Sequence, residues 1–358
     1  MMSTAPSTNL QKSPPPPPAL REEDEAWAFC WHSLVQVSRT FSKPIELLPA
    51  ELRAATTCGY LLCRIADTVE DDPNMSQSAR DELFTAFLAV LEDGESPARF
   101  CQLAHSLEAD APEFELATNL DRVLRVFEKL PEPMQRVCVQ WTGEMVRGMS
   151  LYGHRQPGAN GVVTLNTVAD LERYCYFVAG TVGRLLTGLF SHAIDDLSHE
   201  RFTRMHQYAE SFGLGLQMVN ILKDQTDDLT RGWCFIPQTL WRAHGLTPAD
   251  MLDETRHDDA RAAVAPVFDT AREHLDAALE YTLAIPAEQT GIRLFCLLPL
   301  WMAVRTLAVA DGNEAMFVAD APVKISRDEV GRLIASATQH VADDAALREQ
   351  YAKLCRVD

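Results

Sequence analysis

The segment SFGLGLQMVNILKDQTDD, residues 211–228, joins an apolar stretch to three aspartates, Asp224, Asp227 and Asp228. Spacings of three and four residues place these carboxylates on one side of a helix. Within an arc of roughly 100°, the same side also carries Gln217, Asn220 and Arg231. A solvated helix surface is the alternative, but it would more often mix Lys and Glu than present two amides followed by three aspartates.

A similar group of carboxylates follows a second apolar segment, in YLLCRIADTVEDD, residues 60–72. Asp67, Glu70 and Asp71 repeat the spacing, and Tyr60 and Arg64 fall on the same helix side, within roughly 120°. Oxygen ligands one helical turn apart suit Mg²⁺, which keeps waters and shares the phosphates of a substrate. We predict metal ligands in both groups, and name Asp67, Glu70 and Asp71 the first acid row and Asp224, Asp227 and Asp228 the second acid row.

Spacing alone does not establish these sites. With about one residue in seven acidic, roughly one such triplet is expected by chance, and the third, Asp250, Asp253 and Glu254, follows HGLTP without an apolar helix. We assign it to the electrostatics of a helix start, with Thr247 as the cap. Two rows facing each other would bind a diphosphate through Mg²⁺ and stabilise the carbocation left when that diphosphate departs.

Composition narrows the function classes. The formal net charge of −19, from 51 acidic and 32 basic residues, argues against broad electrostatic binding of nucleic acid. The nine cysteines form no C-x-x-C pair, and no signal peptide precedes them. We expect reduced thiols in a cytoplasmic protein.

Apolar residues recur at helical intervals through most of residues 24–350, and strand-like alternation is scarce. The pattern predicts one all-α domain over residues 24–358. Residues 1–23, with five prolines at 14–18, are predicted to form a disordered proline-rich arm. The apolar run 294–304 is far shorter than the roughly 20 residues of a membrane span, so we expect a buried helix there and no transmembrane helix. Peripheral contact with the inner membrane surface stays open.

Four blocks of sequence resemble the head-to-head prenyl synthases, which include squalene, dehydrosqualene and phytoene synthases. They are SRTF at 38–41, YLLCRIADTVEDD at 60–72, YCYFVAGTVG at 174–183 and GLGLQMVNILKDQTDDLTRGWCFIP at 213–237. The resemblance implies an all-α isoprenoid synthase helical bundle with a central cavity, farnesyl diphosphate as the substrate, and Mg²⁺ bound by both acid rows. Among the carboxylates, it implies catalytic roles for Asp67, Asp71, Asp224 and Asp228.

The same resemblance implies roles for further side chains. Arg39, Arg64 and Arg231 look like diphosphate contacts, which the planar guanidinium suits; surface ion pairing is the alternative. Tyr174 resembles a tyrosine that exchanges a proton with the diphosphate and stabilises positive charge; the alternative is a core tyrosine. Substrate contacts are also expected at Gln217, Asn220, Phe41, Tyr60 and Phe295. For the three aromatic residues, core packing is the alternative.

Two features depart from a simple match or leave alternatives. Lys223 precedes Asp224 where relatives often carry arginine, so bidentate phosphate binding is less secure there. The small residues Ala179, Gly180 and Gly183 allow close approach either of two helices or of a helix and a prenyl chain.

A reductant site would separate squalene synthases from relatives that need no reductant. The GLGLQ sequence at 213–217 lacks the third glycine and preceding strand of a Rossmann site. However, VKIS at 323–326 and FCLLPLWMAVRTLA at 295–308 resemble squalene synthases, which bind NADPH without that fold. Lys324, Ser326 and Arg327 are the predicted NADPH contacts; Ser326 as a helix cap is the alternative.

We therefore expect a squalene synthase activity that condenses two farnesyl diphosphates to presqualene diphosphate and reduces it with NADPH. One alternative is a non-reductive relative that makes presqualene diphosphate, dehydrosqualene, hydroxysqualene or phytoene. Another is a non-catalytic helical binding protein of the same fold. We expect a monomer.

Overall fold

The computed structural model describes residues 13–38, 40–158, 161–319, 321 and 323–356. In the first half of the chain, where η marks a short 3-10 helix, the elements are η1 (Pro18–Glu23), α1 (Asp24–Val37), α2 (Ser42–Glu46), α3 (Ala50–Glu70), α4 (Gln77–Asp93), α5 (Ala98–Leu103), η2 (Ala104–Ser106), α6 (Ala111–Thr118), α7 (Leu120–Phe127) and α8 (Glu132–Gly153).

The second half contains the longest helices and two short strands. Its elements are β1 (Val163–Thr164), α9 (Val168–Cys175), the π-helical segment η3 (Tyr176–Gly180), α10 (Thr181–Ala193), α11 (His199–Thr230), β2 (Trp233–Cys234), α12 (Gln238–Ala243), the 3-10 helices η4 (Pro248–Leu252) and η5 (Glu254–Arg256), α13 (His257–Ala284), α14 (Thr290–Ala310), the 3-10 helix η6 (Glu314–Phe317), α15 (Arg327–His340) and α16 (Asp344–Leu354). The predicted all-α fold is confirmed.

Helix ends follow local sequence signals. Ser76, Ser198 and Ser326 cap the starts of α4, α11 and α15 by accepting backbone N–H groups two or three residues into each helix. Gly94 ends α4 in the left-handed conformation, with a φ of 68°, which glycine adopts without steric penalty.

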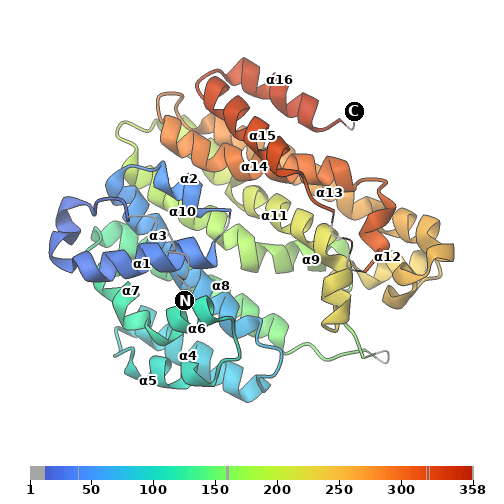
Figure 1. Ribbon diagram of the computed structural model, residues 1–358, viewed down its shortest axis with the longest axis horizontal. Helices are drawn as coiled ribbons and strands as arrows, with labels where there is room; N and C mark the ends of the chain where they lie inside the picture. Colours follow the sequence, from blue (N-terminus) through green and yellow to red (C-terminus); the bar gives the residue numbers. More distant parts are fainter. Residues whose placement is uncertain (1–12, 39, 159–160, 320, 322, 357–358) are drawn as a thin grey trace, which may run out of the picture.

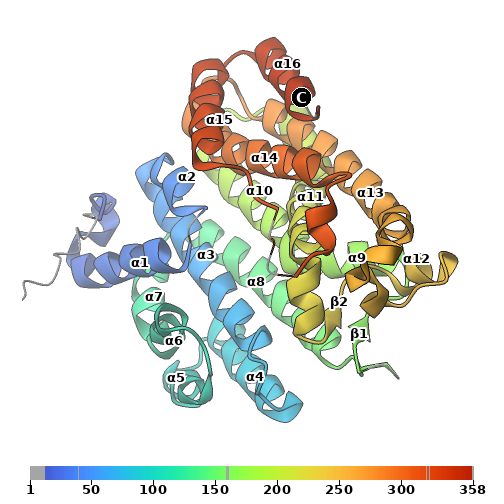
Figure 2. The same cartoon turned by 45° about the vertical axis from the view of Figure 1, so that its right-hand side comes forward.

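The helices are arranged around α11. Figure 1 shows α1 and α3 to α7 on one side of the molecule and α13 to α16 on the other, with α10 and α11 between them. The rotated view in Figure 2 keeps this order and shows β1 and β2 together beyond the end of α8. These strands pair in parallel, Val163 with Trp233 and Thr164 with Cys234, and so tie the segment before α9 to the end of α11.

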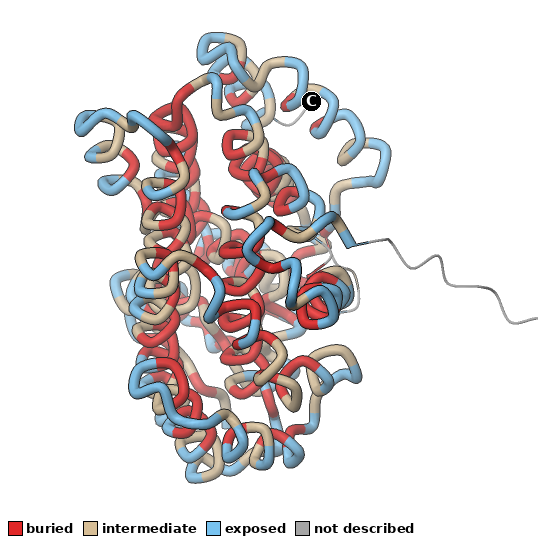
Figure 3. The backbone as a smooth tube through the Cα atoms, turned by 90° about the vertical axis from the view of Figure 1, so that its left-hand side faces the viewer, coloured by how far each residue is buried: buried red, intermediate tan, exposed pale blue. Residues whose placement is uncertain are grey.

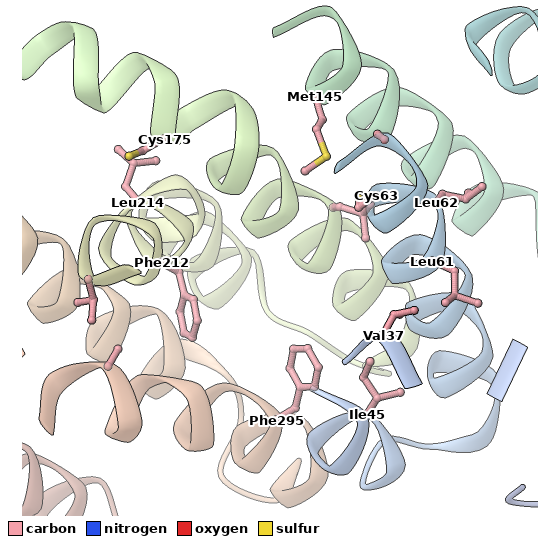
Figure 4. Packing of buried hydrophobic residues seen from close by; sticks show 14 of the residues in the cluster. Val37, Ile45, Leu61, Leu62, Cys63, Met145, Cys175, Phe212, Leu214 and Phe295 are labelled. Atoms are coloured by element: carbon pink, nitrogen blue, oxygen red, sulfur yellow. The ribbon is translucent and has the colours of Figure 1, made fainter. Parts of the chain in front are cut away.

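One continuous apolar core runs through the described chain. Figure 3 shows buried residues along the inner helices and exposed residues on the outer turns. In Figure 4, Val37 of α1, Ile45 of α2 and Phe295 of α14 point toward a common region, so helices distant in sequence share this core. No disulfide links the nine cysteines.

Close packing of α11 against α10 and against η3, which precedes α10, depends on glycine. A Cβ atom at Gly183 would lie 1.9 Å from the carbonyl oxygen of Ala209, and one at Gly213 would lie 2.1 Å from that of Ala179. These backbones approach too closely for any larger side chain. Of the two interpretations of the small residues in FVAGTVG, helix packing accounts for Gly183.

Two predicted boundaries differ from the structure. Residues 13–23 are not a detached arm: Pro18–Glu23 forms η1, its Leu20 is buried, and the Trp27 indole donates a hydrogen bond to the Pro14 carbonyl oxygen at 2.8 Å. Residues 1–12 lie outside the described residues. The low apolar content of residues 1–23 gave no sign that Leu20 is buried or that Trp27 of α1 binds this segment.

The apolar run 294–304 lies within the longer helix α14, of 21 residues. In the described chain, α14 is the one helix with the length and hydropathy to cross a membrane, and 78% of its most apolar window is buried inside the protein. Arg293, fully buried, donates hydrogen bonds to the carbonyl oxygens of Ile285 and Val341. The prediction of a buried core helix is therefore confirmed, although its bounds were too short.

Candidate functional site

The two acid rows lie at the C-terminal ends of their helices. Asp67 and Glu70 lie in the last turn of α3 and Asp71 is its C-cap residue, while the second acid row occupies the last turns of α11 and Arg231 is the C-cap residue. A helix C-terminus carries partial negative charge from its unpaired carbonyl groups. Carboxylates gathered there are destabilised unless a cation binds, so both rows are placed to attract one.

The pKa directions indicate that the rows face each other. Burial, then repulsion from Asp224, raises the pKa of Asp228 to about 7, and Asp71 of the other row adds to the increase. Conversely, burial raises the pKa of Asp71, whereas Arg64 and the Arg231 guanidinium of the second row's helix act to lower it. Charges influence one another this way only at short range. The ends of α3 and α11 are therefore close enough for their charges to act on one another.

Asp67 is desolvated yet reachable. Burial and the charge of Asp71 raise the pKa of Asp67 to about 7, while 35% of its side chain is accessible to solvent. Both properties fit a carboxylate that lines a deep recess open to water. Such a group binds a hard cation readily because the cation removes the repulsion that raises its pKa.

The end of α3 is held by side chains that the sequence did not single out. Asp72, 3% exposed, accepts hydrogen bonds from the backbone N–H groups of Asn74, Met75 and Glu108. Arg80 of α4 donates to the carbonyl oxygens of Val69 and Asp72. These bonds satisfy the polar groups at the helix end and fix the direction of the first acid row.

Tyr174 lies beside the first acid row. Burial raises the pKa of this tyrosine well above 10, and the charges of Glu70 and Asp71 raise it further, so the phenol stays protonated at neutral pH. Its ring stacks on Phe235 with centroids 4.8 Å apart, and Phe235 stacks on Trp233 at 5.4 Å. The short strand β2 thus brings an aromatic stack to the phenol.

A polar network supports the other side of Tyr174. The edge-to-face partner of its ring is Tyr152, at 5.2 Å between centroids. The Tyr152 hydroxyl donates to Asp170 at 3.0 Å, and Arg155 donates to the same Asp170 oxygen at 2.5 Å while lying over the Tyr152 ring. The position of Tyr174 is therefore fixed from both sides.

A cavity of about 620 Å³ adjoins the first acid row, one helical turn before Asp67. Its lining includes the predicted residues Phe41, Tyr60 and Arg64, and the rings of Phe41 and Tyr60 lie 5.9 Å apart. Phe295 is not among the lining residues. It is buried behind Phe41, 6.5 Å away between centroids, as core packing would have it.

Arg64 is shared between two carboxylates. It donates to Glu113 of α6 at 3.2 Å and lies 4.0 Å from Asp67, while its buried Nε has no hydrogen-bond partner. The guanidinium therefore retains one unused N–H donor. Glu113 was not predicted, because it comes from a helix distant in the sequence.

The second acid row has a cation beside it. Lys223 donates to both carboxylate oxygens of Asp224, at 2.6 and 2.5 Å, and so balances that charge without bidentate guanidinium geometry. Gln217 is half-buried and Asn220 is exposed on the same helix. Arg39, also predicted to contact diphosphate, lies outside the described residues.

The donor set fits Mg²⁺ shared with a substrate more closely than a cation held by protein alone. Among residues 13–38, 40–158, 161–319, 321 and 323–356, no three carboxylate, histidine or cysteine side chains are close enough together to hold a metal. Mg²⁺ commonly takes one or two carboxylates and completes its shell with waters and phosphate oxygens. Two separated rows with carboxyl pKa values raised to about 7 fit that arrangement.

The predicted NADPH contacts do not line the cavity beside the first acid row. Ser326 accepts the backbone N–H of Glu329 at 3.2 Å as the N-cap of α15, which is the alternative given by the sequence. Lys324 and Arg327 are exposed. Lys324 lies on the segment that links η6 to α15, and Arg327 is the first residue of α15; both are outside the cavity lining given above.

The third carboxylate triplet has a structural role. Asp250 accepts the backbone N–H of Thr247 at 2.6 Å at the start of η4, and Asp253 accepts the backbone N–H of Thr255 at 2.9 Å at the start of η5. The assignment to helix starts is confirmed.

The sequence of this chain is similar to those of known proteins. Residues 34–329 match the family model described as Squalene/phytoene synthase. A relative named Squalene synthase BSS from Botryococcus braunii is 30% identical over 319 residues, 88% of this chain and 65% of the relative. Squalene synthase ERG9 from Saccharomyces cerevisiae is 30% identical over 79% of this chain and 61% of its own length. The chain thus spans less than two thirds of these relatives.

Solved structures share the fold. The structure of TcSQS with the ligand E5700 has a TM-score of 0.79 and 27% identity, and the match covers 92% of this chain and 91% of that one. A dehydrosqualene synthase structure matches with a TM-score of 0.64 over 90% of this chain, at 20% identity. This second likeness supports the fold alone.

Proposed function

Because the chain belongs to the squalene/phytoene synthase family, we propose that it is a squalene synthase. It condenses two farnesyl diphosphates head to head into presqualene diphosphate, which then rearranges and is reduced by NADPH to squalene. Named squalene synthases at about 30% identity support this choice within the family.

The observation that carries the proposal is the pair of acid rows at the C-terminal ends of α3 and α11, whose charges act on one another. Asp67 and Asp71 on one side and Asp224 and Asp228 on the other would hold Mg²⁺, which neutralises a departing diphosphate. Glu70 and Asp227 extend the two rows.

The remaining side chains would orient the substrate and contact its diphosphate. Arg64 and Arg231, whose charges both act on Asp71, would donate hydrogen bonds to diphosphate oxygens. The phenol of Tyr174, protonated at neutral pH, would donate a hydrogen bond to the leaving diphosphate, and its ring would stabilise nearby positive charge. Phe41 and Tyr60 would place aromatic rings on one side of the cavity, where they can stabilise a nearby carbocation.

The reductive step requires a hydride donor. Lys324 and Arg327, exposed and cationic, would contact the phosphates of NADPH, since arginine suits a 2′-phosphate. Ser326 would contribute through its place at the start of α15. A cytoplasmic location, contact with a membrane surface and a monomeric state belong to the same proposal.

Product analysis tests the proposal. The purified protein is incubated with farnesyl diphosphate and Mg²⁺, with and without NADPH, and the lipid products are separated. Squalene that forms only with NADPH is the expected result. A C30 product that is unaffected by NADPH would contradict the reductive assignment.

A non-reductive relative is the second candidate, and the cap role of Ser326 favours it because that bond occupies a predicted cofactor residue. The same experiment separates it, since it would yield presqualene diphosphate, dehydrosqualene or hydroxysqualene. Absence of Mg²⁺-dependent diphosphate release would instead point to a binding protein without catalysis.

A further inference from the structure

Gln225 is a buried amide next to the second acid row. It follows Asp224 on α11, about 100° farther around the helix, and is 3% exposed. Its neighbours one turn earlier, Ile221 and Leu222, are buried and apolar. An apolar side chain at this position would pack without the desolvation penalty of an amide. The amide therefore needs an explanation.

The amide makes one hydrogen bond, to the backbone of η6. Gln225 Nε2 donates to the carbonyl oxygen of Met316 at 3.2 Å, within the protein interior. The other amide atom, Oε1, is buried without a hydrogen-bond partner. Burying the amide leaves one acceptor without a hydrogen bond, which costs stability. Among the described residues, its one compensating hydrogen bond is the contact with η6.

The contact holds η6, which precedes the segment that carries Lys324; residues 320 and 322 of that segment lie outside the described residues. Met316 and Phe317 of η6 are buried, and Asn313 caps this helix by accepting the backbone N–H of Ala315 at 3.0 Å. At the far end, Val323 is buried and Ser326 caps α15. Between these anchors, the segment carries the exposed Lys324.

We propose that Gln225 is a positioning residue that fixes η6, from which the chain leads to Lys324 and α15, relative to the second acid row. This inference rests on the proposed function, in which Lys324 and Arg327 contact the reductant. The reductant takes part only after presqualene diphosphate has formed. Gln225 therefore acts on the reductive half of the reaction and leaves the condensation half intact.

The test is the Gln225→Leu variant, which keeps similar volume and removes the hydrogen bond. The full chain is supplied with farnesyl diphosphate, Mg²⁺ and varied NADPH, and squalene and presqualene diphosphate are both quantified. We expect the squalene to presqualene diphosphate ratio to fall about fivefold and the KM for NADPH to rise about fivefold, in line with the loss of one hydrogen bond. Farnesyl diphosphate consumption should stay within about twofold of wild type.

Thr187→Val is the matched control. Thr187 Oγ1 makes a buried contact with the Tyr281 hydroxyl at 2.9 Å, between α10 and α13 and away from η6. This variant should lose comparable thermal stability while keeping the product ratio and the KM for NADPH, which separates positioning from a general loss of packing.

Three results would overturn the inference. Equal losses in both half-reactions, or an unchanged product ratio in Gln225→Leu when wild type makes squalene, would show that Gln225 does not act as this positioning residue. A wild-type protein that makes no squalene with NADPH would overturn the proposed function, and this inference with it.

Discussion

Asp67 lies one turn before Asp71 on α3, where burial and its neighbour's charge raise its pKa to about 7. Asp67→Asn preserves the shape of the side chain and removes a charged metal ligand. We expect farnesyl diphosphate consumption to fall at least about a hundredfold, as for loss of one preorganised electrostatic group. Steady-state assays at saturating Mg²⁺ measure this, and the thermal midpoint should not decrease.

The control is Asp250→Asn, the same substitution in the carboxylate triplet that only caps a helix start. It should keep full turnover. Normal turnover by Asp67→Asn would instead show that the first acid row is not the metal site.

Asp228 gives a pH-dependent prediction for the metal-free protein. Its pKa is raised from 3.8 to about 7 by burial and by Asp224, so the unfolded chain loses this proton at lower pH than the folded protein. The resulting stability is complete below about pH 4 and is lost as the pH rises to about 7. Asp228→Asn removes this loss.

Thermal unfolding in a chelator at pH 5 and pH 8 checks the sign. Wild type should lose more stability than Asp228→Asn over this interval, by about 1 kcal/mol after allowance for solvent screening, and Mg²⁺ should reduce the difference. Equal pH dependence in the two proteins would contradict the repulsion between carboxylates.

Residue positions on one helix were predictable from the sequence, because helical periodicity alone places Asp67 beside Asp71 and Asp224 beside Asp228. Partners from other helices were not. Glu113 meets Arg64 across 49 positions, and Asp72 meets the Glu108 backbone across 36. Such contacts depend on how the helices pack, which no local spacing encodes.

At the scale of elements, we predict that the close contact between α10 and α11 does not tolerate a side chain at Gly183. Gly183→Ala would bring a Cβ atom to 1.9 Å from the Ala209 carbonyl oxygen, which is rigid backbone. The helices must separate, and we expect a loss of about 2–4 kcal/mol in the free energy of unfolding, measured by chemical denaturation.

Gly331→Ala is the opposite case. Gly331 lies inside α15, and a Cβ atom there meets nothing within 4 Å. Alanine should stabilise by about 0.5–1 kcal/mol because it lowers the entropy of the unfolded chain and favours the helix. A loss in Gly331→Ala, or no loss in Gly183→Ala, would contradict the described packing.

Elements were predictable in kind but not in their ends or their minor parts. The apolar run 294–304 extends to the 21 residues of α14, because Arg293 is buried through hydrogen bonds that hydropathy does not register. The pairing of Val163 with Trp233 was invisible in two-residue strands, yet it brings Phe235 to Tyr174.

For the whole molecule, α11 explains how distant sequence blocks form one site. It carries the second acid row, packs closely against η3 at Gly213, and binds η6 through Gln225. The all-α class followed from periodicity, whereas the facing of the two rows depended on a resemblance. Helix order alone leaves many ways to pack such a bundle.

The central claim is that the two acid rows bind one diphosphate together. Isothermal titration calorimetry of inorganic diphosphate in the presence of Mg²⁺ tests it with wild type, Asp71→Asn, Asp224→Asn and the control Asp250→Asn. We predict that wild type and control bind alike, and that loss of a carboxylate from either row weakens binding at least about tenfold, or about 1.4 kcal/mol. Unchanged binding after neutralising one of the two rows would contradict the claim.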